Sequence, residues 1–136
     1  MPYLFALLLC ACDRHTESAG ASVTPVPNIE SLKLAAARGD RAASDRVVSY
    51  YFEREPSFPA SEIMQWDHVA ANNGSILGAL NLAFEYYHRD GPFNCKAAKA
   101  WARVVLAETG NNTARPDAVA RRSAQVLLNE PRLSSC

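Results

Sequence analysis

The sequence predicts an all-α protein, a short α-solenoid of antiparallel helical hairpins, and three observations support this. Ala is abundant while Val and Ile are sparse outside short runs, a composition that favours helix over strand. Several residues recur at an offset of 35 positions, a length typical of a two-helix repeat. The chain has only 136 residues, which limits it to one domain.

Composition also narrows the class of partner. Lys plus Arg and Asp plus Glu both number 14, so nothing favours a polyanion such as nucleic acid. The longest uncharged apolar stretch, Met1 to Cys12, is too short to span a bilayer. We therefore expect no nucleic-acid partner and no transmembrane helix.

Residues 1–12 predict a signal peptide, because an apolar run stops at small residues and turns polar at once with Asp13. The segment Leu9-Cys10-Ala11-Cys12 resembles the lipobox of bacterial lipoproteins, which implies that Cys12 is lipidated and becomes the first residue of the mature protein. The usual Lys or Arg of the n-region is missing. A buried N-terminal helix and a signal without lipid attachment are the alternatives.

Residues 13–27 predict a flexible tether, and residues 28–136 are expected to form the repeat domain. The tether is rich in small residues, Ser, Thr and Pro, and it has no apolar periodicity. A lipid at Cys12 would hold the domain in the periplasm. The sequence leaves open whether the anchor lies in the inner or the outer membrane.

One shift of 35 residues aligns five pairs of positions along the expected helices. The pairs are Gly39 with Gly74, Ala43 with Gly78, Val47 with Leu82, Tyr51 with Tyr86 and Trp66 with Trp101. The same shift places Ala35-Ala36 on Ala70-Ala71, so a half-repeat is expected before the first whole one. Residues four apart share one helical stripe, and a neighbouring hairpin must cover that apolar stripe.

Turn residues give the bounds of the first whole repeat. One helix is expected from Asp40 to Arg54 and its partner from Ala60 to Asn72. Pro56 and Pro59 lie between these two helices and favour a turn there.

The second repeat follows the same plan. A helix from Ser75 to Arg89 leads through the loop Asp90 to Phe93 into a helix from Cys95 to Thr109. Asn94 is the expected N-cap of that second helix. A last helix, from Pro116 to Asn129, is expected to cap the stack.

These repeated residues resemble the Sel-like repeat family, relatives of the tetratricopeptide repeats with slightly longer units. In the second repeat the matching positions are Gly78, Leu82-Ala83, Tyr86, Gly91, Asn94, Ala97-Ala98, Trp101 and Gly110. In the first they are Ala43, Val47-Val48, Tyr51, Trp66, Ala70-Ala71 and Gly74. The resemblance covers roughly residues 31–110 and implies about two and a half Sel-like repeats plus a C-terminal capping helix.

Two cysteines follow the leader region, Cys95 and Cys136, and we expect them to form a disulfide in an oxidising periplasm. The expected last helix runs antiparallel to the one before it, so the tail returns toward the start of the Cys95 helix. A capped free thiol and a frayed tail are the alternatives.

No motif predicts catalysis. His15, His68 and His88 lack metal-ligand spacing, and neither a nucleophile elbow nor a phosphate-binding Gly loop occurs. We therefore expect neither an enzyme nor a cofactor or metal. The repeated Trp and Tyr residues are expected to form core.

The favoured function class is protein binding, and an enzyme subunit and a small-ligand carrier are less favoured alternatives. Five aromatic residues outside the core register of the repeats are the candidate anchors for a partner: Tyr50, Phe58, Phe84, Tyr87 and Phe93. The family resemblance implies an adaptor or scaffold, and some Sel-like lipoproteins inhibit secreted antibacterial effectors, including lipases. The prediction is an immunity protein that neutralises such an effector. An envelope scaffold or assembly adaptor for a secretion or cell-wall complex is the alternative.

Overall fold

The structure, a computed structural model, describes residues 28–110 and 114–136, and these residues form helices and connecting turns without a strand. The helices are α1 (Ile29–Ala37), α2 (Arg41–Phe52), α3 (Ala60–Asn72), α4 (Ile76–Tyr87), α5 (Pro92–Thr109), α6 (Arg115–Leu128) and α7 (Pro131–Ser134). The predicted all-α class is confirmed. The predicted signal peptide, lipidated Cys12 and tether lie outside the described residues.

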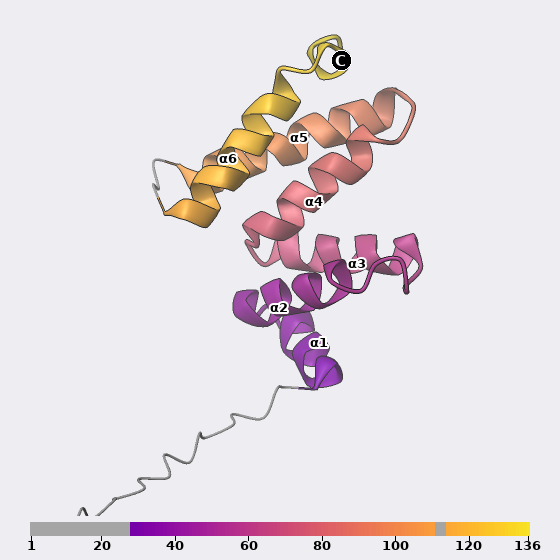
Figure 1. Cartoon of the computed structure of the whole chain (residues 1–136), viewed down its shortest axis with the longest axis vertical. Helices are drawn as coiled ribbons and strands as arrows, with labels where there is room; N and C mark the ends of the chain where they lie inside the picture. Colours follow the sequence, from indigo (N-terminus) through magenta and orange to yellow (C-terminus); the bar gives the residue numbers. More distant parts are fainter. Residues whose placement is uncertain (1–27, 111–113) are drawn as a thin grey trace, which may run out of the picture.

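Successive helices run back and forth, so the chain builds a stack from α1 at one end to α6 and α7 at the other (Figure 1). Each helix packs against the next one. In addition, α2 contacts α4 and α4 contacts α6, so the first helices of successive hairpins form a layer of their own. Each hairpin therefore covers apolar surface that its neighbour leaves open. None of the described helices combines the length and apolar character needed to cross a membrane.

Repeat-related positions begin the helices of this layer in the same way. Gly39 and Gly74 adopt φ of +97° and +83°, a region that favours glycine. The next residues, Asp40 and Ser75, accept hydrogen bonds at their side-chain oxygens from backbone N–H groups three residues later. These N-caps satisfy donors that the first turn of a helix leaves open.

The core consists of small and apolar residues at the predicted stripe positions. Val47 of α2 and its repeat partner Leu82 of α4 are both fully buried. Gly78 lets α4 approach α3 closely, because an added Cβ would lie 2.9 Å from the Ala70 Cβ. The predicted contact between hairpins therefore depends on the absence of a side chain at Gly78.

One predicted helix start and two predicted helix ends are wrong; one of these ends is that of α4, which lies at Tyr87 rather than at Arg89. Helix α5 begins at Pro92, three residues before the expected Cys95, because proline suits the first turn of a helix and Gly91 supplies the φ of +103° before it. Asn94 therefore lies within the first turn and does not cap it; its side-chain amide donates to the Asp90 carbonyl. Helix α2 ends at Phe52 rather than at Arg54.

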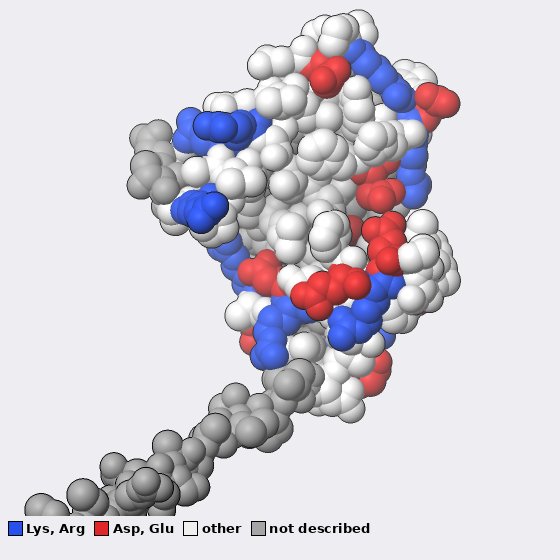
Figure 2. All heavy atoms as spheres, in the orientation of Figure 1, with Lys and Arg blue, Asp and Glu red and all other residues white. Residues whose placement is uncertain are grey.

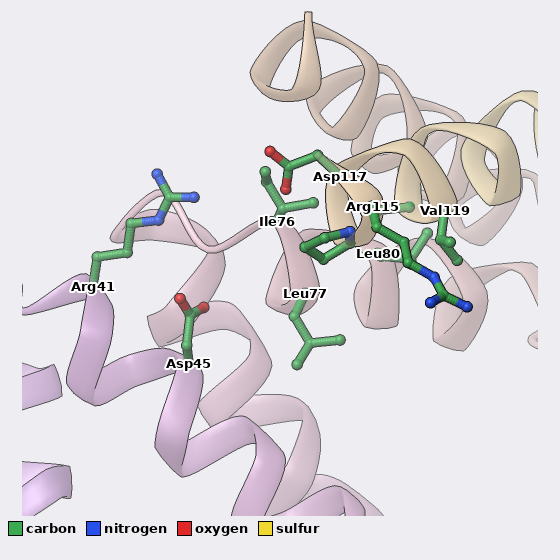
Figure 3. Close-up of a pocket in the computed structure, with 10 residues that line it drawn as sticks. Arg41, Asp45, Ile76, Leu77, Leu80, Arg115, Asp117 and Val119 are labelled. Carbon is green, nitrogen blue, oxygen red and sulfur yellow. The ribbon is translucent and has the colours of Figure 1, made fainter. Parts of the chain in front are cut away.

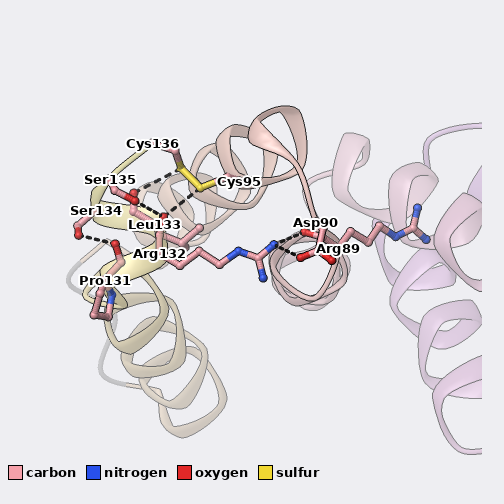
Figure 4. Close-up of a disulfide and its surroundings, with 9 residues drawn as sticks. All are labelled: Arg89, Asp90, Cys95, Pro131, Arg132, Leu133, Ser134, Ser135 and Cys136. Carbon is pink, nitrogen blue, oxygen red and sulfur yellow. Dashed lines mark hydrogen bonds and ion pairs between the residues drawn. A yellow bond between two sulfur atoms is a disulfide. The ribbon is translucent and has the colours of Figure 1, made fainter.

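The C-terminal tail adds a short helix that the sequence did not predict, and it is joined to α5. Cys136 forms the predicted disulfide with Cys95, with a Cα–Cα distance of 6.2 Å (Figure 4). Leu133 of α7 is fully buried, and Arg132 donates to the Arg89 carbonyl and pairs with Asp90 at 3.3 Å. The tail therefore closes the end of the stack through one covalent bond and several polar contacts.

Candidate protein-binding groove

A groove of about 700 Å³ lies where the first halves of α2, α4 and α6 come together. Its lining residues are Arg41, Asp45, Ile76, Leu77, Leu80, Arg115, Pro116, Asp117, Val119 and Ala120. The view in Figure 3 shows side chains of α4 lying between those of α2 and those of α6. We call this hollow the groove. It belongs to the layer of first helices and spans successive hairpins.

Helix α4 supplies an apolar floor. Ile76 and Leu80 are partly buried against the main core, which holds them in place, whereas Leu77 is exposed. Across the groove, Val119 of α6 is also exposed, at 60% of its surface. Exposed apolar side chains gathered in a hollow mark an interaction surface more strongly than scattered ones do.

Charged residues of both signs form the rim. Arg41 and Asp45 come from α2, and Arg115 and Asp117 come from α6. The Ser75 hydroxyl donates to the Asp45 carboxylate. Figure 2 shows a broad uncharged area over α4 with acidic and basic side chains around its edge.

The bond from Ser75 also connects the rim to the fold. The same hydroxyl oxygen accepts the Gly78 N–H at 3.0 Å, so one side chain both caps α4 and ties α4 to α2. Ser75 is itself buried. The relative position of these two groove walls therefore depends on a satisfied internal hydrogen-bond network.

The structure disperses the five predicted aromatic anchors. Phe84 and Phe93 are exposed, as expected for anchors, but neither lines the groove. Tyr50, Phe58 and Tyr87 are half-buried instead. Phe58 folds back on the first hairpin because its ring packs 4.6 Å from the ring of Tyr51, centroid to centroid. Tyr87 lies beneath Arg132, whose guanidinium is 5.6 Å from the ring centroid.

Sequence reasoning missed the apolar residues that the groove does expose. Leu77 directly precedes Gly78, and Val119 directly precedes Ala120, so each lies one position before a buried small residue. An apolar residue just off the core stripe of a helix is the signal that could have found both.

The repeated aromatic residues are only partly core. Tyr51 is fully buried, and its hydroxyl donates to the Glu62 carboxylate. Trp66, Trp101 and Tyr86 are half-buried. The His68 Nε2 atom lies 3.2 Å from the Tyr86 hydroxyl, so this hydroxyl has an internal partner, and the His68 ring packs edge-on against Trp101. The prediction that the repeated Tyr and Trp residues form core is therefore confirmed for Tyr51, whereas the other three are only partly buried.

The groove offers apolar contact area and a rim with charges of both signs, which are features of surfaces that bind other proteins. Within residues 28–110 and 114–136, no group of three His, Cys, Asp or Glu side chains is placed to hold a metal ion. A scan against protein-family models, a search of curated proteins and a search of solved structures all found no match.

Proposed function

We propose that this protein binds another protein through the groove, and that the partner is a secreted antibacterial effector, such as a lipase, which it neutralises as an immunity protein. One observation carries the binding role: exposed apolar side chains of α4 and α6 line a hollow with a mixed-charge rim. The immunity role is supported by the Sel-like resemblance and the lipobox at Cys12. An envelope scaffold is the alternative.

The groove favours a partner that inserts an apolar side chain. Fully burying an exposed Leu or Val side chain contributes about 1.5 to 3 kcal/mol. Leu77 and Val119 are 38% and 60% exposed, so a partner that covers them gains part of that energy from each, and both are candidate anchors. The rim residues Arg41, Asp45 and Arg115 then orient the partner, because unlike charges must face each other across the contact.

The proposal places this surface at a membrane. A lipid on Cys12 and a tether over residues 13–27 would hold the stack in the periplasm, where it meets an effector on arrival. Tethering also raises the local concentration of the inhibitor near any target in the same membrane.

The test uses two valines of α6 that are equally exposed. Val119 is 60% exposed and lines the groove, whereas Val126 is 58% exposed and lies outside it. The full chain is produced with the product of an adjacent toxin gene, and co-purification and survival of the producing cell are measured. Val119→Asp is expected to lower capture and survival at least about tenfold, and Val126→Asp should leave both unchanged.

Equal capture by the two variants would contradict the groove as the binding surface. A deletion strain that survives every neighbouring toxin expressed in its periplasm would contradict the immunity role. If the protein then associates stably with a secretion or cell-wall complex in the parent strain, which still produces it, that result would favour the scaffold alternative.

A further inference from the structure

A second hollow, of about 240 Å³, continues the line of the groove toward the other ends of α2 and α4. Its lining includes six aromatic, acidic or amide residues: Phe52, Glu55, Asp67, Asn81, Phe84 and Glu85. On α2, Val48 comes three residues after Asp45, and Phe52 comes four residues after Val48, which places all three on one helical face. We call this hollow the acidic pocket. A partner that lies along the groove therefore reaches it.

Asp67 is the unusual residue of this pocket. Only 1% of its surface is exposed, although it lines the hollow. Its Oδ1 accepts a hydrogen bond from the Asn81 amide at 3.0 Å, while Oδ2 has no hydrogen-bond partner within the described part of the chain. Every fully inaccessible side-chain oxygen or nitrogen there does have a partner, so Oδ2 must reach the pocket surface. Buried carboxylates are normally paired or fully hydrogen-bonded.

The charge around Asp67 is negative. Glu55 and Glu85 also line the acidic pocket, and neither Lys nor Arg does. Arg89 lies 3.8 Å from Glu85, but both side chains are more than a third exposed, so solvent screens this pair. Arg54 instead stacks on Tyr50, with its guanidinium 4.0 Å from the ring centroid.

This environment raises the pKa of Asp67 to about 6. Burial is the main cause, and the negative charges of Glu85 and Glu55 add to it, whereas the hydrogen bond from Asn81 acts in the opposite direction. At neutral pH the pocket therefore holds a buried carboxylate without a counter-charge. A cation entering the pocket would relieve that unfavourable state.

We infer that the acidic pocket binds the guanidinium group of an arginine side chain presented by the partner protein. This inference rests on the proposed function and specifies the chemistry of the partner. A guanidinium is planar, so it can stack on the exposed rings of Phe52 and Phe84 while donating to the Asp67 carboxylate. A lysine ammonium can donate to the same carboxylate but lacks the planar face.

The binding test uses a probe that does not require the natural partner. The full chain with Cys12→Ser is titrated with N-acetyl-arginine amide, and the Asn81 side-chain amide is followed by NMR. N-acetyl-citrulline amide is the matched ligand control, because it has nearly the same shape without the charge. We expect the arginine derivative to bind at least about tenfold more tightly than the citrulline derivative. N-acetyl-lysine amide is titrated in the same way. Equal binding of the arginine and citrulline derivatives, or tighter binding of the lysine derivative than of the arginine derivative, overturns the inference.

Two variants locate the site. Asp67→Asn is expected to weaken arginine binding about tenfold or more, while Glu108→Gln, on the exposed face of α5 outside the pocket, removes the same charge without effect. In the unsubstituted chain, saturating probe should lower the pKa of Asp67 below its value of about 6, read from the carboxyl carbon shift. An unchanged Asp67 titration at saturation contradicts the assignment.

These outcomes separate the two proposals. If Val119→Asp abolishes partner capture but the arginine probe fails to bind, only the acidic pocket inference is wrong. If the probe binds at Asp67 but both valine variants capture the partner equally, the groove is wrong and the pocket stands.

Discussion

Replacing Asp67 by Asn should stabilise the protein at neutral pH. The carboxyl pKa rises from 3.8 to about 6 on folding, so the folded protein favours the neutral form of this group. A shift of about two units corresponds to about 3 kcal/mol. The substituted side chain would be neutral at every pH, and its amide oxygen could still accept the hydrogen bond that Asn81 donates to Oδ1.

The pH dependence follows from the sign of that shift. The contribution of Asp67 to stability is fully present below pH 3.8 and is lost as the pH rises through about 6. The free energy of unfolding of Asp67→Asn minus that of the unsubstituted protein should therefore increase as the pH rises from 3.5 to 7. The gain should approach about 3 kcal/mol, because the side chain is almost completely buried.

Urea unfolding of the oxidised proteins, followed by tryptophan fluorescence across this pH range, measures the difference. Comparing the two proteins cancels the titration of the groups that do not interact with Asp67. Glu108→Gln is the control, because this exposed side chain should give a difference that does not depend on pH. A constant gap between Asp67→Asn and the unsubstituted protein, or a gap that shrinks toward pH 7, would refute the reasoning.

Three further perturbations test the framework of the stack. Reduction of the Cys95–Cys136 disulfide should lower the free energy of unfolding by about 4 kcal/mol, because the bond closes a loop between cysteines 41 residues apart in the sequence. Calorimetry with and without reductant measures this loss. Gly78→Val should cost about 1 to 3 kcal/mol in thermal unfolding, because even a Cβ would meet α3 at 2.9 Å; a neutral result contradicts the close approach. Ser75→Ala should cost about 1 to 2 kcal/mol in urea unfolding by removing the cap of α4, while exposed Ser57→Ala should cost little.

Local sequence patterns predicted the repeating elements well. The glycines Gly39 and Gly74 adopt the positive φ that ends one helix and permits the next. Val47 and Leu82 lie in the core at the positions that the offset of 35 residues predicts. Such features depend on residues within a turn or two of the helix, and a sequence displays those neighbours directly.

Errors arose where a turn or the C-terminal tail folds back on a helix. Phe58, a predicted anchor, is half-buried because the turn after α2 folds back on Tyr51. Tyr87, another predicted anchor, is half-buried, and the C-terminal tail brings Arg132 over its ring. The disulfide was predictable all the same, since antiparallel packing of consecutive helices brings Cys136 back to Cys95.

The sequence by itself determined the helix class, the stripes of the core and the cysteine pair. Only the tertiary structure decided that α2, α4 and α6 leave a groove with Leu77 and Val119 exposed in it. It also decided that Asp67 is buried beside Asn81 with one oxygen facing a pocket. Helix periodicity says which residues share a face, but the depth of a groove and the desolvation of a carboxylate depend on how far neighbouring helices approach one another.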